Sequence, residues 1–259
     1  SSAASDVYKR QHLGSDKNKK NNVRKSAKSN KSGSTSMSNN AIQNARDLSR
    51  VDKHNYRKYD NNQDNIEIIR GTSSLYDDVR NLYKEEFEEA RLEYNSKQTR
   101  ENRKINDYFT NISNNEKNDL ACEIIIELGD KKYWDTKDLN FKKRMTSVYK
   151  EQVEDLETML PNFKIASAII HYDETSPHLH IVGVPIKYKN KNGMSKQVGK
   201  SDVFTKESLT KLQDKISKAM QNKELTFVVS SALMEDTNKI KVTVINNSNE
   251  NIDKLKALD

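Results

Sequence analysis

The 259-residue sequence is poor in cysteine, proline and glycine. It has one cysteine, Cys122, three prolines and seven glycines. A single cysteine excludes a disulfide framework and any all-cysteine zinc module, and the low proline and glycine counts exclude collagen-like and proline-rich linker sequences. The longest apolar runs, such as Ile124–Ile126, are too short to cross a bilayer, and no secretory signal is visible. We therefore expect a soluble cytoplasmic protein with no membrane partner.

The net charge of +7 comes from one stretch of the chain. Residues 17–31 hold seven basic residues and no acid, and the rest of the sequence is electrically balanced. Such a Lys/Asn/Ser-rich stretch cannot bury enough apolar surface to offset its chain entropy. We expect residues 1–36 to be a disordered basic tail that is not native, with Met37 as the true initiator.

A second basic stretch lies in the C-terminal half. It has no acid, it has a turn signal at Asn192-Gly193, and its lysines are Lys187, Lys189, Lys191, Lys196 and Lys200. A cationic loop of this kind is typical of phosphate-backbone binding, so we predict that these five lysines bind DNA. A merely solvated loop is the alternative.

The remaining sequence mixes helical and strand patterns, which predicts an α+β fold. We expect a main domain at 37–220 and a β-hairpin extension of uncertain origin at 221–259, with strands at 225–230 and 240–245. In the main domain, residues 40–48 are only a weak strand candidate. The other expected elements are helices at 75–112, 138–160 and 206–220, the last capped by Thr205, and strands at 121–128, 164–171 and 178–186.

Three of the five histidines fall within ten residues, at His171, His178 and His180. His178 and His180 share one face of a strand because side chains alternate, and the tight return at 172–177 brings His171 beside them. Three imidazoles on a rigid hairpin predict a divalent-metal site with open positions for substrate. Asp173 and Glu174 in the return could supply a fourth ligand, a base or a partner to the ligands.

These motifs resemble the Mob/Pre family of plasmid mobilisation relaxases, also called plasmid recombination enzymes. The resemblance rests on His-x-Asp-Glu-x-x-Pro-His-x-His and on the upstream Lys53-His54-Asn55-Tyr56-Arg57, and it covers 38–220. It implies an antiparallel sheet flanked by helices and a histidine metal cluster of the HUH endonuclease type. It also implies Mn²⁺ or Mg²⁺ as cofactor and strand-specific nicking of plasmid DNA, single-stranded near the nick, at an origin of transfer. A conjugation coupling protein is a further implied partner.

The resemblance also implies roles for individual residues. His171, His178 and His180 would bind the metal, Glu174 would act as ligand or base, and Asp173 would stand behind it. His54 would be the nucleophile that forms a covalent adduct with the 5′ phosphate, and Arg57 would place that phosphate. Tyr56 and Tyr59 lie close by in the sequence and remain alternative nucleophiles; an exposed loop histidine is the plainer interpretation of His54.

Three other functions are compatible with the histidine cluster. A rolling-circle replication initiator would need a tyrosine after the cluster, and Tyr188 is one of few candidates. A DNA-binding protein with a structural metal would need a fourth protein ligand to close the site. A metal-dependent hydrolase of small molecules is the third alternative, but the lysines between 187 and 200 favour a polyanionic substrate instead.

Overall fold

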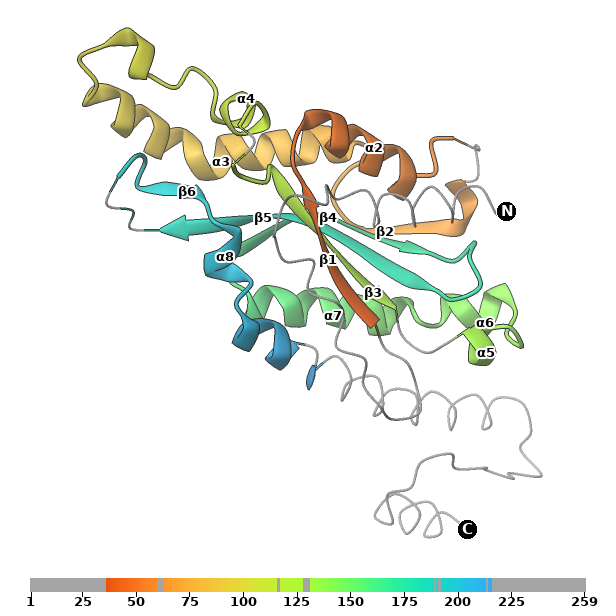
Figure 1. Cartoon of the computed structure of the whole chain (residues 1–259). Helices are drawn as coiled ribbons and strands as arrows, with labels where there is room; N and C mark the ends of the chain where they lie inside the picture. The colour runs from red at the N-terminus through yellow and green to blue at the C-terminus, as the bar shows by residue number, and fades with distance from the viewer. Residues whose placement is uncertain are drawn as a thin grey trace, which may run out of the picture.

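The centre of the fold is an antiparallel sheet. The structure is a computed structural model and describes residues 36–59, 63–115, 117–127, 131–188, 190, 192–212 and 214–215. The strand order is β1-β3-β5-β4-β2, and β6 pairs with β5 (Figure 1). Residues 1–35 of the expected tail at 1–36 and the expected hairpin at 221–259 lie outside these residues, whereas Ser36 belongs to the first strand. The strands are β1 (Ser36–Ile42), β2 (Ile66–Arg70), β3 (Ala121–Glu127), β4 (Phe163–His171), β5 (His178–Tyr188) and β6 (Lys196–Val198).

Helices cover both faces of this sheet, so the predicted α+β class is confirmed. In Figure 1, α2, α3 and α4 lie above the sheet and α7 lies below it. The helices are α2 (Ala45–Asn55), α3 (Leu75–Ser96), α4 (Tyr108–Ser113), α5 (Lys131–Trp134), α6 (Leu139–Lys143), α7 (Thr146–Met159) and α8 (Lys200–Val203), with short 3₁₀ turns η1 (Gln63–Asn65) and η2 (Glu101–Arg103).

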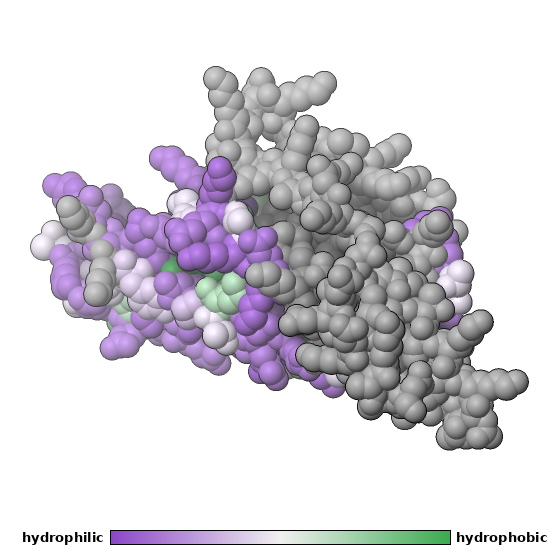
Figure 2. Space-filling view, turned by 90° about the horizontal axis from the view of Figure 1, so that it is seen from below, coloured by the Kyte–Doolittle hydropathy of each residue, from purple (hydrophilic) through white to green (hydrophobic). Residues whose placement is uncertain are grey.

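Alternation along the strands divides the core into two layers. Leu179 and Ile181 of β5 pack with α7, whereas Val182 and Val184 pack with α2 and α3. Each fully buried aliphatic side chain contributes about 1.5–3 kcal/mol relative to exposure. The central strand β5 is therefore packed against helices on both faces of the sheet. Among the described residues, no helix combines the length and apolar character needed to cross a bilayer, and the described surface seen from below is mostly hydrophilic (Figure 2).

The first strand is well formed, but it lies at Ser36–Ile42 rather than at the weak candidate 40–48, whose second half begins α2, a helix that the sequence analysis did not predict. β1 pairs with β3 over its full length, from Ser36 opposite Glu127 to Ile42 opposite Ala121. The polar sequence Ser-Met-Ser-Asn-Asn hides this strand because β1 is an edge of the sheet, where pairing to one neighbour is enough. The adjacent α2 begins after Asn44, whose side chain accepts a hydrogen bond from the Asp47 amide at 3.0 Å.

The predicted helix at 75–112 is too long. α3 ends at Ser96, and the chain returns as a loop before α4. Asn95 fixes this loop, because its side chain donates to the Ile105 carbonyl at 2.8 Å and accepts from the Ile105 amide at 2.9 Å. No glycine or proline marks the end of α3, so sequence pattern alone overran it.

Other boundaries also needed correction. The predicted helix at 138–160 is two helices, α6 and α7, and the sequence analysis missed β2, β6 and α8 because each has only three to five residues. The capping role of Thr205 is confirmed: residues 206–212 are helical and the Ser208 amide donates to the Thr205 hydroxyl oxygen at 3.1 Å.

Candidate metal centre

The register of β4 and β5 gathers the three motif histidines. His171, the last residue of β4, lies opposite His178, the first residue of β5, and Ile169 lies opposite His180. All three rings stand on the face of the sheet that α2 covers, as the alternation predicted. The ring centroids are 4.3 Å apart for His171 and His180, 5.1 Å for His171 and His178, and 4.9 Å for His178 and His180.

His54 joins this cluster from the last turn of α2. Its ring centroid lies 5.5 Å from that of His171 and 5.3 Å from that of His180. Donor atoms lie within 4.8 Å of one another in two sets, one from His54, His171 and His180 and the other from His171, Glu174 and His178. The predicted trio of His171, His178 and His180 is not one of these sets, because His178 and His180 fall in different ones. Residues 117 or more positions apart in sequence thus converge on one centre, and His54 is not an exposed loop histidine.

Each motif histidine makes a hydrogen bond that fixes one of its two ring nitrogens. His171 Nε2 lies 2.8 Å from the Asn55 carbonyl oxygen, and His178 Nδ1 lies 2.9 Å from the Ser176 carbonyl oxygen. A carbonyl only accepts, so these nitrogens carry the proton, and the other nitrogen of each neutral ring presents its lone pair. His171 therefore offers Nδ1 and His178 offers Nε2.

The third ring is fixed by a carboxylate. His180 Nδ1 lies 2.8 Å from Glu123 Oε1, and both side chains are buried. Glu123 Oε1 also accepts a hydrogen bond from the side-chain amide Nδ2 of Asn55 at 3.1 Å. Glu123 and Asn55 thereby connect the end of α2 to the metal-site strands. The sequence analysis assigned neither residue a role, although a carboxylate inside the apolar strand Ala121–Glu127 is a signal, since buried acids are rarely tolerated without a partner.

The surroundings of His171, His180 and His54 favour the neutral form of these three rings. Burial, reinforced by the neighbouring histidines, lowers the pKa of His171 and of His180 well below the usual 6.5. Burial, followed by the charge of Arg57, also lowers the pKa of His54, and the Glu123 carboxylate opposes this. Neutral imidazole is the form that coordinates a metal or attacks an electrophile.

The Lys-His-Asn-x-Arg segment is a helix C-terminus of defined geometry. The amide of Arg57 donates to the His54 carbonyl at 3.1 Å, and the amide of Lys58 donates to the Lys53 carbonyl at 3.0 Å, which together form a Schellman motif. Arg57 occupies the left-handed position of this motif at φ 51°. Glycine is usual there, and a non-glycine residue costs about 1–2 kcal/mol.

The Arg57 side chain explains why an arginine is held in this conformation. Its Nε and Nη2 donate to the two carboxylate oxygens of Asp173 at 2.7 and 2.8 Å, and Nη2 also donates to Glu174 at 2.9 Å. This fork joins the end of α2 to the β4–β5 turn. Because two carboxylates contact the guanidinium, Arg57 orients the turn, and its contact with the scissile phosphate stays a prediction.

The two alternative tyrosines stand apart from the cluster. The Tyr56 hydroxyl is buried and lies 3.2 Å from the Ser167 hydroxyl, and burial raises the pKa of Tyr56 to about 12. Tyr59 is 64% exposed. With so high a pKa, Tyr56 is a poor nucleophile, which favours His54 over Tyr56.

The predicted lysine loop does not adjoin the histidines. Lys187 lies nine residues along β5 from His178, about 30 Å at 3.3 Å per residue. Lys187, Lys196 and Lys200 lie 3.3, 3.5 and 3.0 Å from Asp202, Glu86 and Asp119 respectively. Lys189 and Lys191 lie outside the described residues. The position inferred for this loop is wrong, and DNA binding by its lysines stays a prediction.

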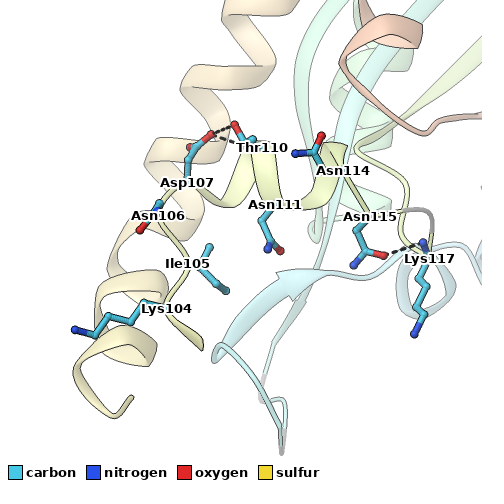
Figure 3. A pocket seen from close by; sticks show the side chains of 9 residues that line it. All are labelled: Lys104, Ile105, Asn106, Asp107, Thr110, Asn111, Asn114, Asn115 and Lys117. Carbon is cyan, nitrogen blue, oxygen red and sulfur yellow. Dashed lines mark hydrogen bonds between the residues drawn. The ribbon is translucent and has the colours of Figure 1, made fainter. Parts of the chain in front are cut away.

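The donor set fits a divalent metal ion. His171 Nδ1 is buried and has no hydrogen-bond partner among the described residues, which a bound cation would remedy. By contrast, the open pocket of about 660 Å³ near α4 shares no residue with the cluster. Its lining is mostly polar and consists of Lys104, Ile105, Asn106, Asp107, Thr110, Asn111, Asn114, Asn115 and Lys117 (Figure 3).

The fold is an α+β sheet protein in which three histidines at the adjoining ends of β4 and β5 cluster with a fourth, His54, from α2. Its family follows from sequence comparison: the family model for plasmid recombination enzymes (Mob_Pre) matches residues 42–228, and the chain belongs to that family. The predicted family is therefore confirmed, and the chain is a DNA relaxase. No curated protein sequence matches it.

Solved structures of similar fold include the MobM relaxase domain bound to origin-of-transfer DNA of plasmid pMV158. One Mn-bound crystal structure shares 17% identity over 85% of this chain and 98% of that chain, with a TM-score of 0.47. Another, bound to a 26-nucleotide DNA, shares 19% identity over 83% of this chain and 96% of that chain, with a TM-score of 0.41.

Proposed function

We propose that this chain nicks and rejoins one strand of plasmid DNA at an origin of transfer, through a metal-dependent covalent intermediate, for conjugative mobilisation or plasmid recombination. The observation that carries the proposal is the convergence of a neutral, partly buried His54 on the hydrogen-bonded cluster of His171, His178 and His180. The MobM relaxase domain, similar in fold, was crystallised with Mn and with origin-of-transfer DNA. A conjugation coupling protein remains a predicted partner.

His171 Nδ1, His178 Nε2 and His180 Nε2 would hold the cation, because hydrogen bonds occupy the other nitrogen of each ring. Mn²⁺ or Mg²⁺ bound there would neutralise charge that develops on the phosphoryl oxygens. Glu174 lies 3.9 Å from His178 Nε2 and could complete the ligand set or serve as a base. Asp173 orients Arg57 and thereby the turn that carries Glu174.

His54 would supply the nucleophilic nitrogen. Its lone pair forms a bond to phosphorus, the bond from phosphorus to the 3′ oxygen breaks, and the leaving oxygen takes up a proton to become a 3′ hydroxyl. The positive charge that develops on the His54 ring is favoured by the carboxylates of Glu123 and Glu174, both of which raise its pKa. Attack of a 3′ hydroxyl on the phosphoramidate reverses these steps and reseals the strand.

A trapped adduct tests this assignment. The chain is incubated with Mn²⁺ and a supercoiled plasmid that carries the DNA flanking its gene, and the covalent complex is isolated and treated with mild acid. We expect an acid-labile adduct that is absent in His54→Ala and present in Tyr56→Phe and Tyr59→Phe. An acid-stable adduct that survives His54→Ala would transfer the role to a tyrosine.

A rolling-circle initiator is the second candidate, and the structure argues against it. Its nucleophile would be a tyrosine after the cluster, but Tyr188 is the last residue of β5, about 33 Å along the strand from His178. A purely structural metal is also disfavoured, because His54 provides a reactive group beside the predicted ligands.

A further inference from the structure

The β4–β5 turn that carries Glu174 is braced by the segment that contains α6 and the start of α7. Lys142 Nζ donates to the Glu174 carbonyl oxygen at 3.0 Å, and the Tyr149 hydroxyl donates to the Pro177 carbonyl oxygen at 2.6 Å. A further bond of 2.5 Å joins the hydroxyls of Thr146 and Tyr172. Figure 1 shows α6 beside this turn, at the end of the sheet opposite β6. The position of α6 against the metal centre is therefore fixed.

This segment is strongly basic. Residues 131–144 contain six basic and two acidic residues, and Asp138 is used within the segment, where it accepts from the Phe141 amide at 2.7 Å as the cap of α6. Lys143 and Arg144 are exposed and follow Lys142 directly. Lys142 donates to a carbonyl oxygen, which is uncharged, so this contact does not neutralise the lysine. Lys187, Lys196 and Lys200, by contrast, lie next to negatively charged carboxylates.

An aromatic ring holds two of these cations in place. Lys137 Nζ lies 4.9 Å and Arg144 Cζ lies 5.6 Å from the centroid of the half-buried Phe141 ring. Phe141 in turn contacts the buried Trp134, at a centroid distance of 6.4 Å. The cationic side chains thus stand on a packed base and lose less freedom when they bind an anion.

We propose that Lys142, Lys143 and Arg144, here called the α6 basic surface, bind the phosphate backbone of single-stranded DNA as it passes the metal centre. The inference rests on the proposed function, since it names the surface that holds the substrate next to the site. A backbone contact needs positive charge within reach of the reacting phosphate. Lys142 lies within such reach, because it donates to the carbonyl oxygen of Glu174, whose carboxylate lies 3.9 Å from His178.

The test uses the full chain with His54→Ala, which prevents cleavage, and measures its affinity for fluorescent oligothymidine of about 16 nucleotides by anisotropy. Lys143→Gln with Arg144→Gln should weaken binding about 15-fold at 0.15 M salt and reduce the salt slope by about 1.4, since each single-strand phosphate contact contributes about 0.7. The control is Lys206→Gln with Lys211→Gln, which removes the same charge at two exposed positions of the helix at 206–212. We expect this pair to change the affinity for DNA less than twofold.

Two further variants guard against trivial explanations. Lys143→Arg should bind as the parent does, and Lys143→Glu, a single exposed change, should bind more weakly than Lys143→Gln. Calorimetry with Mn²⁺ alone should give the same affinity in all variants, because none of these side chains faces a predicted ligand nitrogen.

The outcomes separate the two proposals. If the parent binds oligothymidine and Lys143→Gln with Arg144→Gln binds equally well with the same salt slope, the α6 basic surface is not the DNA contact, and the proposed nicking function stands. An equal loss in the control pair would likewise overturn the surface, because net charge would then explain the effect. If the chain with an intact His54 neither binds DNA nor nicks a plasmid, the proposed function itself fails.

Discussion

Glu123 shows how a single buried residue can set the chemistry of its neighbours. It accepts from His180 and from Asn55 through one carboxylate oxygen. We predict that Glu123→Gln lowers the affinity for Mn²⁺ about 10-fold, because residues that orient metal ligands are typically worth 10–100-fold. Calorimetric titration measures this, with Glu154→Gln on the exposed face of α7 as the control for the same chemical change. An unchanged affinity would show that the charge of Glu123 does not matter to the site.

Two substitutions at Arg57 distinguish the effect of its backbone conformation from the effect of its side-chain hydrogen bonds. Arg57→Ala and Arg57→Gly both remove the bonds to Asp173 and Glu174, but only glycine tolerates φ 51° without cost. We expect Arg57→Gly to be more stable than Arg57→Ala by about 1 kcal/mol in urea unfolding, with nicking strongly reduced in both. Equal stability of the two variants would mean that this turn relaxes out of the left-handed region.

The individual site residues were more predictable than their connections. Strand alternation is enough to place His178 and His180 on one face, and a short return is enough to bring His171 beside them. No local pattern reveals that Asn55 accepts from His171 through its carbonyl oxygen, because that contact depends on where α2 ends over the sheet. The same reason hid Glu123, which is assigned a partner only once β3 is paired with β5.

At the scale of elements, the brace between α7 and the β4–β5 turn makes a measurable contribution. The buried Tyr149 hydroxyl donates to the Pro177 carbonyl oxygen. Tyr149→Phe should reduce the free energy of unfolding by about 1 kcal/mol, the usual net value of such a bond, and should speed amide exchange in the turn. Tyr188→Phe, at an exposed position, is the control. If the turn exchanged as slowly as in the parent chain, α7 would not be what holds it.

Element boundaries were the least predictable part of the fold. Hydrophobic spacing at three and four residues located α3 and α7, whose apolar faces are buried. It overran at Ser96 and merged α6 with α7, because neither glycine nor proline marks the end of α3 or of α6. β1 and β2 lie at the two edges of the sheet, so neither needs the apolar alternation by which strands are recognised.

For the whole molecule, the metal should stabilise the fold. A ligand that binds only the folded state at 100 times its dissociation constant adds about 2.7 kcal/mol. For a domain of this size that corresponds to an increase in Tm of roughly 5–10 °C. Thermal unfolding with and without Mn²⁺ should show this rise in the parent chain and its loss in His171→Ala. A comparable rise in His171→Ala would place the cation elsewhere.

The predicted DNA binding by the lysines at the far end of β5 can also be tested on the whole molecule. Replacing Lys187, Lys196 and Lys200 with glutamine should weaken binding to all DNA sequences alike, as expected of backbone contacts. Because each lysine already lies near a carboxylate, we expect a smaller effect per residue than at the α6 basic surface. Anisotropy with two unrelated oligonucleotides measures it, and a loss confined to one sequence would indicate base contacts instead.

The hydrogen bonds that shape the metal centre join residues 68 and 116 positions apart in the chain. Contacts of such long range form late, since the intervening chain must be ordered first. A polypeptide that ends before β4 holds His54 without His171, His178 and His180. The histidine cluster is therefore a property of the paired sheet, since no single segment of the chain contains all four rings.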